Sequence, residues 1–189
     1  MFNLKWTSDP ISTLGITISN DAQFILKNIF EPRLKKFDNI LNMWTSRGLS
    51  LKGRITILKS LALPILLYPM SVLPIPTTVV EVIDNIMLDF IWNKRKPKIK
   101  REVIIQNIEN GGIKAPRFAT IVEANRISWL KRLTSEREAK WTCVLTDLVR
   151  PLSLEHFIEC HLDDKTVNAI GIPFYTQLFT ETDVFTNEN

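Results

Sequence analysis

Cysteine and histidine are scarce in this chain, with two of each among 189 residues. Cys143 and Cys160 are too few for a disulfide framework, and such usage is typical of proteins in a reducing compartment. We therefore expect a cytoplasmic and/or nuclear protein. The same scarcity excludes a scaffold built on several zinc ions, because each structural zinc takes four protein ligands.

A single metal site is not expected either. His156 and Cys160 lie one helical turn apart and His161 follows, but no fourth ligand is evident and the neighbouring apolar residues indicate a packing face. The adjacent pair Asp163-Asp164 points in different directions on a helix, so we interpret it as a cap or turn before residues 165–170.

Glycine is also scarce, with six residues in the chain. The pair Gly111-Gly112 is too short for a phosphate-binding loop or a dinucleotide fingerprint, and no nucleophile paired with a base is apparent. We expect no catalytic centre, no cofactor and no small-molecule substrate.

The chain has one long uncharged run, from Ser60 to Val80. The run has the length of a membrane span, but it contains four prolines, each of which costs a helix interior about 3 kcal/mol. Lipid cannot satisfy the carbonyl groups that proline leaves free. A broken apolar connection in a protein core is the better interpretation, and we expect no membrane partner. The first ten residues also lack the basic and apolar segments of a secretory signal.

Positive charge is concentrated in the first three-quarters of the chain, although the net charge is only +4. Residues 1–140 contain 22 Lys and Arg against 12 Asp and Glu, whereas residues 141–189 contain 2 against 8. This asymmetry indicates a basic body that meets polyanions and an acidic tail that faces elsewhere. The alternative is that this uneven distribution of charge has no functional role.

The spacing of apolar residues indicates a mainly α-helical fold. Between Leu26 and Trp44 they recur at steps of three and four, which is one stripe of an amphipathic helix. The same reasoning predicts five helices: from Asp21 to Trp44, kinked or restarted at Pro32; after a cap at Ser50; from a capping box at Thr78 to about Trp92; after Pro116; and between Glu138 and Val149. The prolines at 64, 69, 74 and 76 are expected to break the chain repeatedly.

Two small β elements complete the predicted fold. Residues 1–20 are predicted to be extended, with a short strand near Thr17-Ile18. Val103 to Ile105 is a second strand candidate, and the turn signal Asn110-Gly111-Gly112 is expected to fold Ile113 back against it as a small β-hairpin.

The clearest chemical feature is a basic linker, in which six of the eight residues from Lys94 to Arg101 are cationic. Such a segment suits a phosphate backbone, because each neutralised phosphate releases counterions, and the nearby indole of Trp92 could stack on an unpaired base. The alternatives are a solvated loop or a nuclear-import signal. Further cations in the first two helices favour a polyanion-binding surface: Arg33, Lys35, Lys36, Arg47, Lys52 and Lys59.

Several short motifs together resemble one known family. Residues 44–55, WTSRGLSLKGRI, resemble the W-x-x-R-x-L-S-L-x-G-[KR]-I pattern of LINE-type, non-LTR retrotransposon reverse transcriptases. Further matches to that family occur in the expected order: Leu14-Gly15-Ile16, Leu63-Pro64 with Tyr68, Phe90-Ile91-Trp92, Gly111-Gly112-Ile113 with Pro116, and Ala124 to Leu133. The resemblance covers about residues 10–135.

The resemblance implies a part of that enzyme without its catalytic residues. In the family the catalytic aspartates lie upstream of the Leu-Gly-Ile strand, and no residue of this chain matches them. Thr13 also replaces the usual tyrosine, and the family's cysteine–histidine knuckle is missing. The implied parts are the remnant of a palm-closing strand (1–20), a helical thumb-like region (21–93), a basic linker with a β-hairpin and helices (94–150), and an acidic C-terminal tail (151–189).

The resemblance further implies a non-catalytic role in gripping a template–primer duplex or the element's RNA. The expected partners are RNA, an RNA–DNA hybrid or DNA, together with the palm and fingers of the polymerase. We predict these nucleic-acid contacts: Arg47, Lys52, Lys59, Trp92, Lys94, Arg95, Lys96, Lys98, Lys100 and Arg101. Arg54 projects from the apolar side of its helix, so a structural pairing and a nucleic-acid contact both stay open for it. The alternative functions are a helical protein-interaction module or an inert retrotransposon relic.

Overall fold

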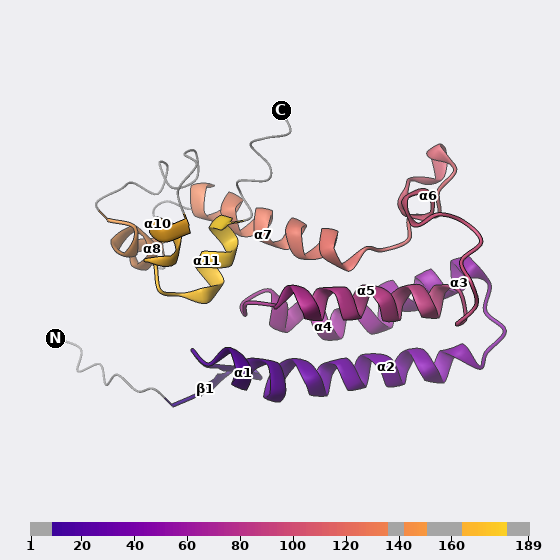
Figure 1. Ribbon diagram of the computed structural model, residues 1–189, viewed down its shortest axis with the longest axis horizontal. Coiled ribbons are helices and arrows are strands. Elements are labelled where there is room, and N and C mark those ends of the chain that lie inside the picture. Colours follow the sequence, from indigo (N-terminus) through magenta and orange to yellow (C-terminus); the bar gives the residue numbers. More distant parts are fainter. Residues whose placement is uncertain (1–8, 136–141, 151–163, 181–189) are drawn as a thin grey trace. The chain divides into compact units, whose positions relative to one another are not determined.

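The computed structural model describes residues 9–135, 142–150 and 164–180, which are mainly helical, as predicted (Figure 1). The chain divides into two compact units, with the boundary between Ile121 and Val122. Each unit has its own buried apolar residues.

The first unit begins with a β-hairpin of β1 (Ile11–Thr13) and β2 (Ile16–Ile18). The strands are antiparallel, and Thr13 pairs with Ile16 across a two-residue turn. Leu14 and Gly15 in that turn have φ angles of 48° and 76°, the sign pattern of the type I′ turn that suits the twist of a hairpin. The predicted strand near Thr17-Ile18 is therefore confirmed as half of a hairpin. The extended segment expected over residues 1–20 is corrected at Leu14-Gly15, where the chain reverses, and the first eight residues of that prediction lie outside the described part of the chain.

The first long helical segment restarts at proline. It consists of α1 (Ala22–Ile25), the π-helical turn η1 (Leu26–Phe30) and α2 (Glu31–Thr45), with Pro32 in the first turn of α2. The second segment repeats this order with α3 (Leu51–Ile57), the π-helical turn η2 (Leu58–Ala62) and α4 (Leu63–Met70), which starts with Pro64 in its first turn. Proline has no N–H and its ring clashes with the carbonyl of residue i−4 in an α-helix, so a wider turn before it relieves both problems.

Two expectations about proline and capping are corrected. Pro64 and Pro69 do not break the chain, because both lie within α4 and the helix ends only at Met70. The helix α5 (Thr77–Ile91) begins before the predicted capping box at Thr78 and has no side-chain cap. The carbonyl group of Pro76 accepts hydrogen bonds from the N–H groups of Val79 and Val80, at 3.0 and 3.2 Å, so Thr78 already lies inside the first turn. By contrast, the predicted cap at Ser50 is confirmed, with Gly53 N–H donating to its Oγ at 3.2 Å.

The core of the first unit lies where α2 packs on α4 and α5, and α3 packs on α5 (Figure 1). Its largest fully buried side chains are Phe30, Phe37, Leu41, Leu58, Leu66, Ile75, Ile83, Met87 and Phe118. Most of these lie on the apolar stripes from which the helices were predicted.

The prediction of a β-hairpin at residues 103–113 is wrong. Residues 101–105 form a single helical turn, α6 (Arg101–Ile105), followed by the 3₁₀ turn η3 (Ile108–Asn110). No strand of the described residues pairs with the β-branched residues there, because the sheet contains only β1 and β2. A helical turn satisfies their backbone groups locally, so tertiary context overrides their β propensity. The expected reversal at Gly111-Gly112 is confirmed, because the N–H groups of Ile113 and Ala115 donate to the carbonyl of Ile104 at 3.2 and 2.9 Å.

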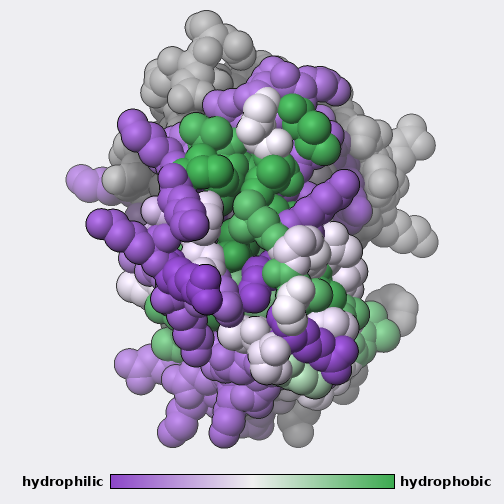
Figure 2. All heavy atoms as spheres, turned by 90° about the vertical axis from the view of Figure 1, so that its right-hand side faces the viewer, coloured by the Kyte–Doolittle hydropathy of each residue, from purple (hydrophilic) through white to green (hydrophobic). Residues whose placement is uncertain are grey.

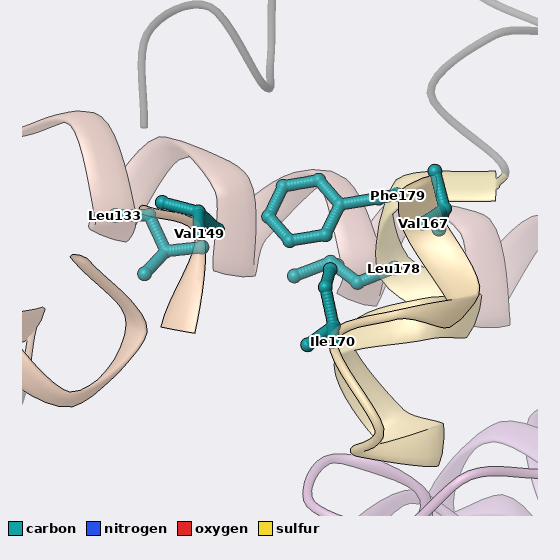
Figure 3. Close-up of a cluster of buried hydrophobic side chains, with 6 residues drawn as sticks. All are labelled: Leu133, Val149, Val167, Ile170, Leu178 and Phe179. Carbon is teal, nitrogen blue, oxygen red and sulfur yellow. The ribbon is translucent and has the colours of Figure 1, made fainter. Parts of the chain in front are cut away.

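The second unit contains most of α7 (Phe118–Ser135), α8 (Thr142–Leu148), α10 (Asp164–Asn168) and α11 (Pro173–Thr180). Figure 3 shows its buried cluster, in which Leu178 and Phe179 of α11 point toward side chains of α7 and of the turn after α8. The members of this cluster are Leu133, Val149, Val167, Ile170, Leu178 and Phe179. Trp129 is partly buried and packs against it.

Several predictions fall outside the described residues. These are the zinc interpretation of His156, Cys160 and His161, the turn at Asp163, and the first turn of the helix predicted from Glu138. The described part of the acidic tail, residues 164–180, is helical and packs in the second unit.

Candidate nucleic-acid interface

An open groove of about 670 Å³ lies in the first unit, at the end where α2 finishes, α3 begins and α5 finishes. We call it the basic groove, because five of its lining residues are cationic: Arg47, Arg54, Arg95, Lys96 and Lys98. None of the described residues that line it is acidic. Figure 2 views the molecule from the side on which α3 and α6 lie in Figure 1, and hydrophilic side chains cover much of that face around a smaller apolar area.

The groove joins three sequence features that are distant along the chain. One wall comes from the motif at residues 44–55, another from Ile91 and Trp92 at the end of α5, and the third from the basic linker. Packing of α3 against α5 brings these segments together. The result is a concave surface with positive charge on several sides, which is the arrangement that concentrates anions.

Arg47 is held at the groove by an aromatic contact. Its guanidinium carbon lies 4.3 Å from the ring centroid of Trp44, which is a cation–π geometry. The indole Nε1 of Trp44 is buried and has no hydrogen-bond partner among the described residues. Trp44 therefore contributes its ring face to the position of Arg47 and its bulk to the packing beneath it.

The linker leaves α5 through two residues with left-handed backbone conformation. Asn93 and Lys94 have φ angles of 54° and 58°, and Lys94 N–H donates to the carbonyl of Asp89 at 2.7 Å. Asn tolerates this region well, whereas for lysine it costs about 1 kcal/mol or more. The reversal brings Arg95, Lys96 and Lys98 to the groove.

Arg54 is the cation that the sequence left undecided between a structural and a binding role. Only 5% of it is exposed, and its Nη1 donates to the carbonyl of Phe90 at 3.1 Å. Its guanidinium carbon lies 5.4 Å from the ring centroid of Phe90. Burial, and secondarily the nearby positive charge of Arg95, lower the pKa of Arg54 from its ordinary value. Arg54 thus packs on α5 and also lines the basic groove.

The structure brings together five of the ten predicted contacts in the groove: Arg47, Trp92, Arg95, Lys96 and Lys98. Lys52 and Lys59 are exposed on α3 and η2 but are not among its lining residues. Lys94 lines a separate pocket of about 160 Å³ that also contains Asp38 and Asp89.

The remaining two predicted contacts, Lys100 and Arg101, line a neighbouring hollow of about 320 Å³ that shares Trp92 and Lys98 with the groove. Trp92 is half-buried between the two depressions. Arg101 has an internal partner, because its Nη2 lies 2.7 Å from the carboxylate of Asp84. Its charge is therefore already neutralised within the protein.

Neither a metal centre nor a membrane span is found in the described ranges. In them, no three His, Cys, Asp or Glu side chains gather as they would around a metal ion. Within the same ranges, every helix is too short or too polar to cross a lipid bilayer.

No family model matches the chain. The chain is similar to a protein of Arabidopsis thaliana that carries the name "Putative ribonuclease H protein", with 24% identity over 128 residues. The match covers 64% of this chain and 20% of that protein, so it spans about a fifth of the relative's length.

Proposed function

We propose that this chain is a non-catalytic, nucleic-acid-binding part of a LINE-type reverse transcriptase, and that the basic groove contacts the sugar–phosphate backbone of a template–primer or of element RNA. The observation that carries the proposal is the gathering of five cationic side chains around one groove whose described lining contains no carboxylate.

The similarity to a protein named for a nuclease supports the broader half of the proposal, a nucleic-acid-related protein of retroelement type. The narrower half, a LINE-type reverse transcriptase, rests on the order of short motifs along the chain. Two of these motifs, at residues 44–55 and 90–92, contribute walls of the groove.

The chemistry of the groove suits a phosphate backbone and carries no sequence code. Arginine and lysine side chains that contact phosphates position a protein on nucleic acid but do not read bases. The exposed side chains of Arg95, Lys96 and Lys98 can follow successive phosphates, and the half-buried indole of Trp92 offers a ring face to an unpaired base. Counterion release at each phosphate would make the affinity steeply dependent on salt.

The test is the binding of the purified chain to a fluorescent RNA–DNA hybrid hairpin across a salt titration. A groove variant replaces Arg47, Arg95, Lys96 and Lys98 with Gln. A matched control replaces with Gln four exposed cations that do not line the groove, Lys27, Lys114, Arg117 and Lys165, and so has the same net charge.

We expect the groove variant to flatten the slope of log K against log salt by about 0.9 for each phosphate that it no longer neutralises. The control should change the slope much less. A folded chain that shows no binding at low salt, or two variants with equal slopes, would contradict the proposal and favour a protein-interaction module or a relic. Primer extension by the purified chain with a divalent metal ion would contradict its non-catalytic part.

A further inference from the structure

Among the described residues of the first unit, two charged side chains are buried, and only one of them has a counter-charge there. Asp84, 7% exposed, accepts from Arg101 Nη2 and from the backbone N–H of Phe118, both at 2.7 Å. Arg54, 5% exposed, contacts the neutral carbonyl group and the ring of Phe90, and no carboxylate of the described residues pairs with it. A buried charge is costly unless an opposite charge accompanies it, so the guanidinium of Arg54 is the uncompensated group of this unit.

The unused donors of Arg54 open toward the basic groove. A guanidinium has five N–H donors, and the contact with Phe90 uses Nη1 alone. Among the described residues, one side-chain nitrogen is fully buried without a hydrogen-bond partner, and it is Nε1 of Trp44. No nitrogen of Arg54 is in that state. Because Arg54 lines the groove, we infer that its remaining nitrogens face it.

We propose that Arg54 binds a single backbone phosphate at the floor of the basic groove, as the one desolvated anion contact among otherwise exposed cations. This inference rests on the proposed function, which supplies a phosphodiester as the anion. The planar guanidinium matches two phosphate oxygens in a bidentate geometry, which an ammonium group does not reproduce. Arg95, which already lies close enough to lower the pKa of Arg54, adds its charge to the same anion.

The geometry separates this contact from those of the exposed cations. Arg95, Lys96 and Lys98 are exposed and can shift along the nucleic-acid backbone, so the neutralisation of any one phosphate should change their contribution to binding little. Arg54 is held by Phe90 and cannot follow a displaced phosphate. One position on the bound strand should therefore be more sensitive to neutralisation than its neighbours.

The experiment uses a set of RNA–DNA hybrid hairpins, each with one phosphate replaced by an uncharged methylphosphonate. With the wild-type chain we expect one position to weaken binding by about tenfold or more, the scale of one charged hydrogen-bonded contact, and the others by much less. In Arg54→Lys the sensitive position should no longer differ from its neighbours. The matched control, Arg117→Lys, makes the same exchange at an exposed arginine that does not line the groove and should keep the wild-type pattern.

A flat methylphosphonate profile with the wild-type chain, together with salt-dependent binding, would overturn the role of Arg54 and leave the proposed function standing. This measurement needs no variant, so a misfolded Arg54→Lys would not weaken it. Loss of all binding would overturn both proposals. Displacement of the hairpin by inorganic phosphate, beyond the effect of chloride at equal ionic strength, would reassign Arg54 to a free anion and overturn the backbone contact.

Discussion

The Oδ1 atom of Asp84 lies 2.7 Å from Nη2 of Arg101 and accepts a second hydrogen bond from Phe118 N–H, also at 2.7 Å. One buried atom therefore ties the middle of α5 to the first residue of α6 and to the first residue of α7. Arg101 is also the last residue of the basic linker, so the pair anchors the segment that forms one wall of the groove. Within the described ranges, none of the other five linker cations forms a salt bridge of this kind.

The anchoring role of Asp84 predicts a large loss of stability in Asp84→Ala. The change leaves the N–H of Phe118 without its acceptor and Arg101, whose side chain is 30% exposed, without its carboxylate. We expect about 2–4 kcal/mol less free energy of unfolding, measured by urea denaturation. Asp38→Ala is the control, because Asp38 accepts from the exposed amide of Asn42 at 2.8 Å, and about 0.5 kcal/mol or less is expected. Equal stability of the two variants would show that the pair anchors nothing.

The hairpin turn predicts a stabilising substitution at Leu14. This residue has φ of 48° and is 86% exposed, so it bears backbone strain without packing in return. Asn enters the left-handed region readily, and Asn-Gly is the preferred pair for this turn. Leu14→Asn should raise the free energy of unfolding by about 0.5–1 kcal/mol in urea denaturation. Leu14→Val, β-branched at positive φ, should lower it; the reverse order would contradict the turn assignment.

The two glycines after η3 predict unequal costs of substitution. A Cβ at Gly112 would overlap the carbonyl oxygen of Gln106, which is a backbone atom and cannot move alone. Gly111 has φ of 79° but open space around its Cβ position. We expect Gly112→Ala to lower the free energy of unfolding by about 2–3 kcal/mol and Gly111→Ala to lower it by about 1 kcal/mol.

Amide hydrogen exchange at Ile113 and Ala115 provides the local measurement for this pair of variants, because their N–H groups donate to Ile104 across the same turn. Protection should fall further in Gly112→Ala than in Gly111→Ala. Equal protection in the two variants would mean that the close approach to Gln106 is not required.

The burial of Tyr175 predicts a pH dependence of the second unit. Burial raises the pKa of its hydroxyl above the ordinary value of 10, because the phenolate is disfavoured beside the apolar cluster. Between the unfolded and the folded pKa the folded state binds more protons, so stability falls as the pH rises through this window and is unaffected below it. Thermal melting at about pH 9 and about pH 11 should therefore show a larger loss in the wild type than in Tyr175→Phe. Equal losses would show that Tyr175 ionises equally in both states.

The helical architecture follows from local patterns. Steps of three and four between apolar residues identified the stripes that are buried in α2, α3, α5 and α7, and the cap at Ser50 was visible as a residue type in front of such a stripe. The patterns were misleading at Val103 to Ile105, where β-branched residues form a helical turn because no strand lies beside them. They were also misleading at Thr78, since the carbonyl of Pro76 had already started the helix.

The sequence predicted only part of the candidate site. Charge density along the chain identified the basic linker, because six cations in eight residues need no fold to be recognised. The state of each cation could not be read in this way. Arg101 lies in the same run as Arg95, yet one meets a buried carboxylate and the other lines a groove.

Local order along the chain thus accounts for most of the helices and for the excess of positive charge in the first unit, since each depends on residues within a few positions of one another. The groove and the isolation of Arg54 depend instead on the packing of α3 against α5, which brings residues 36 positions apart into contact. Coulombic and desolvation effects act through space, so the partner of a buried charge is decided by which helices pack together.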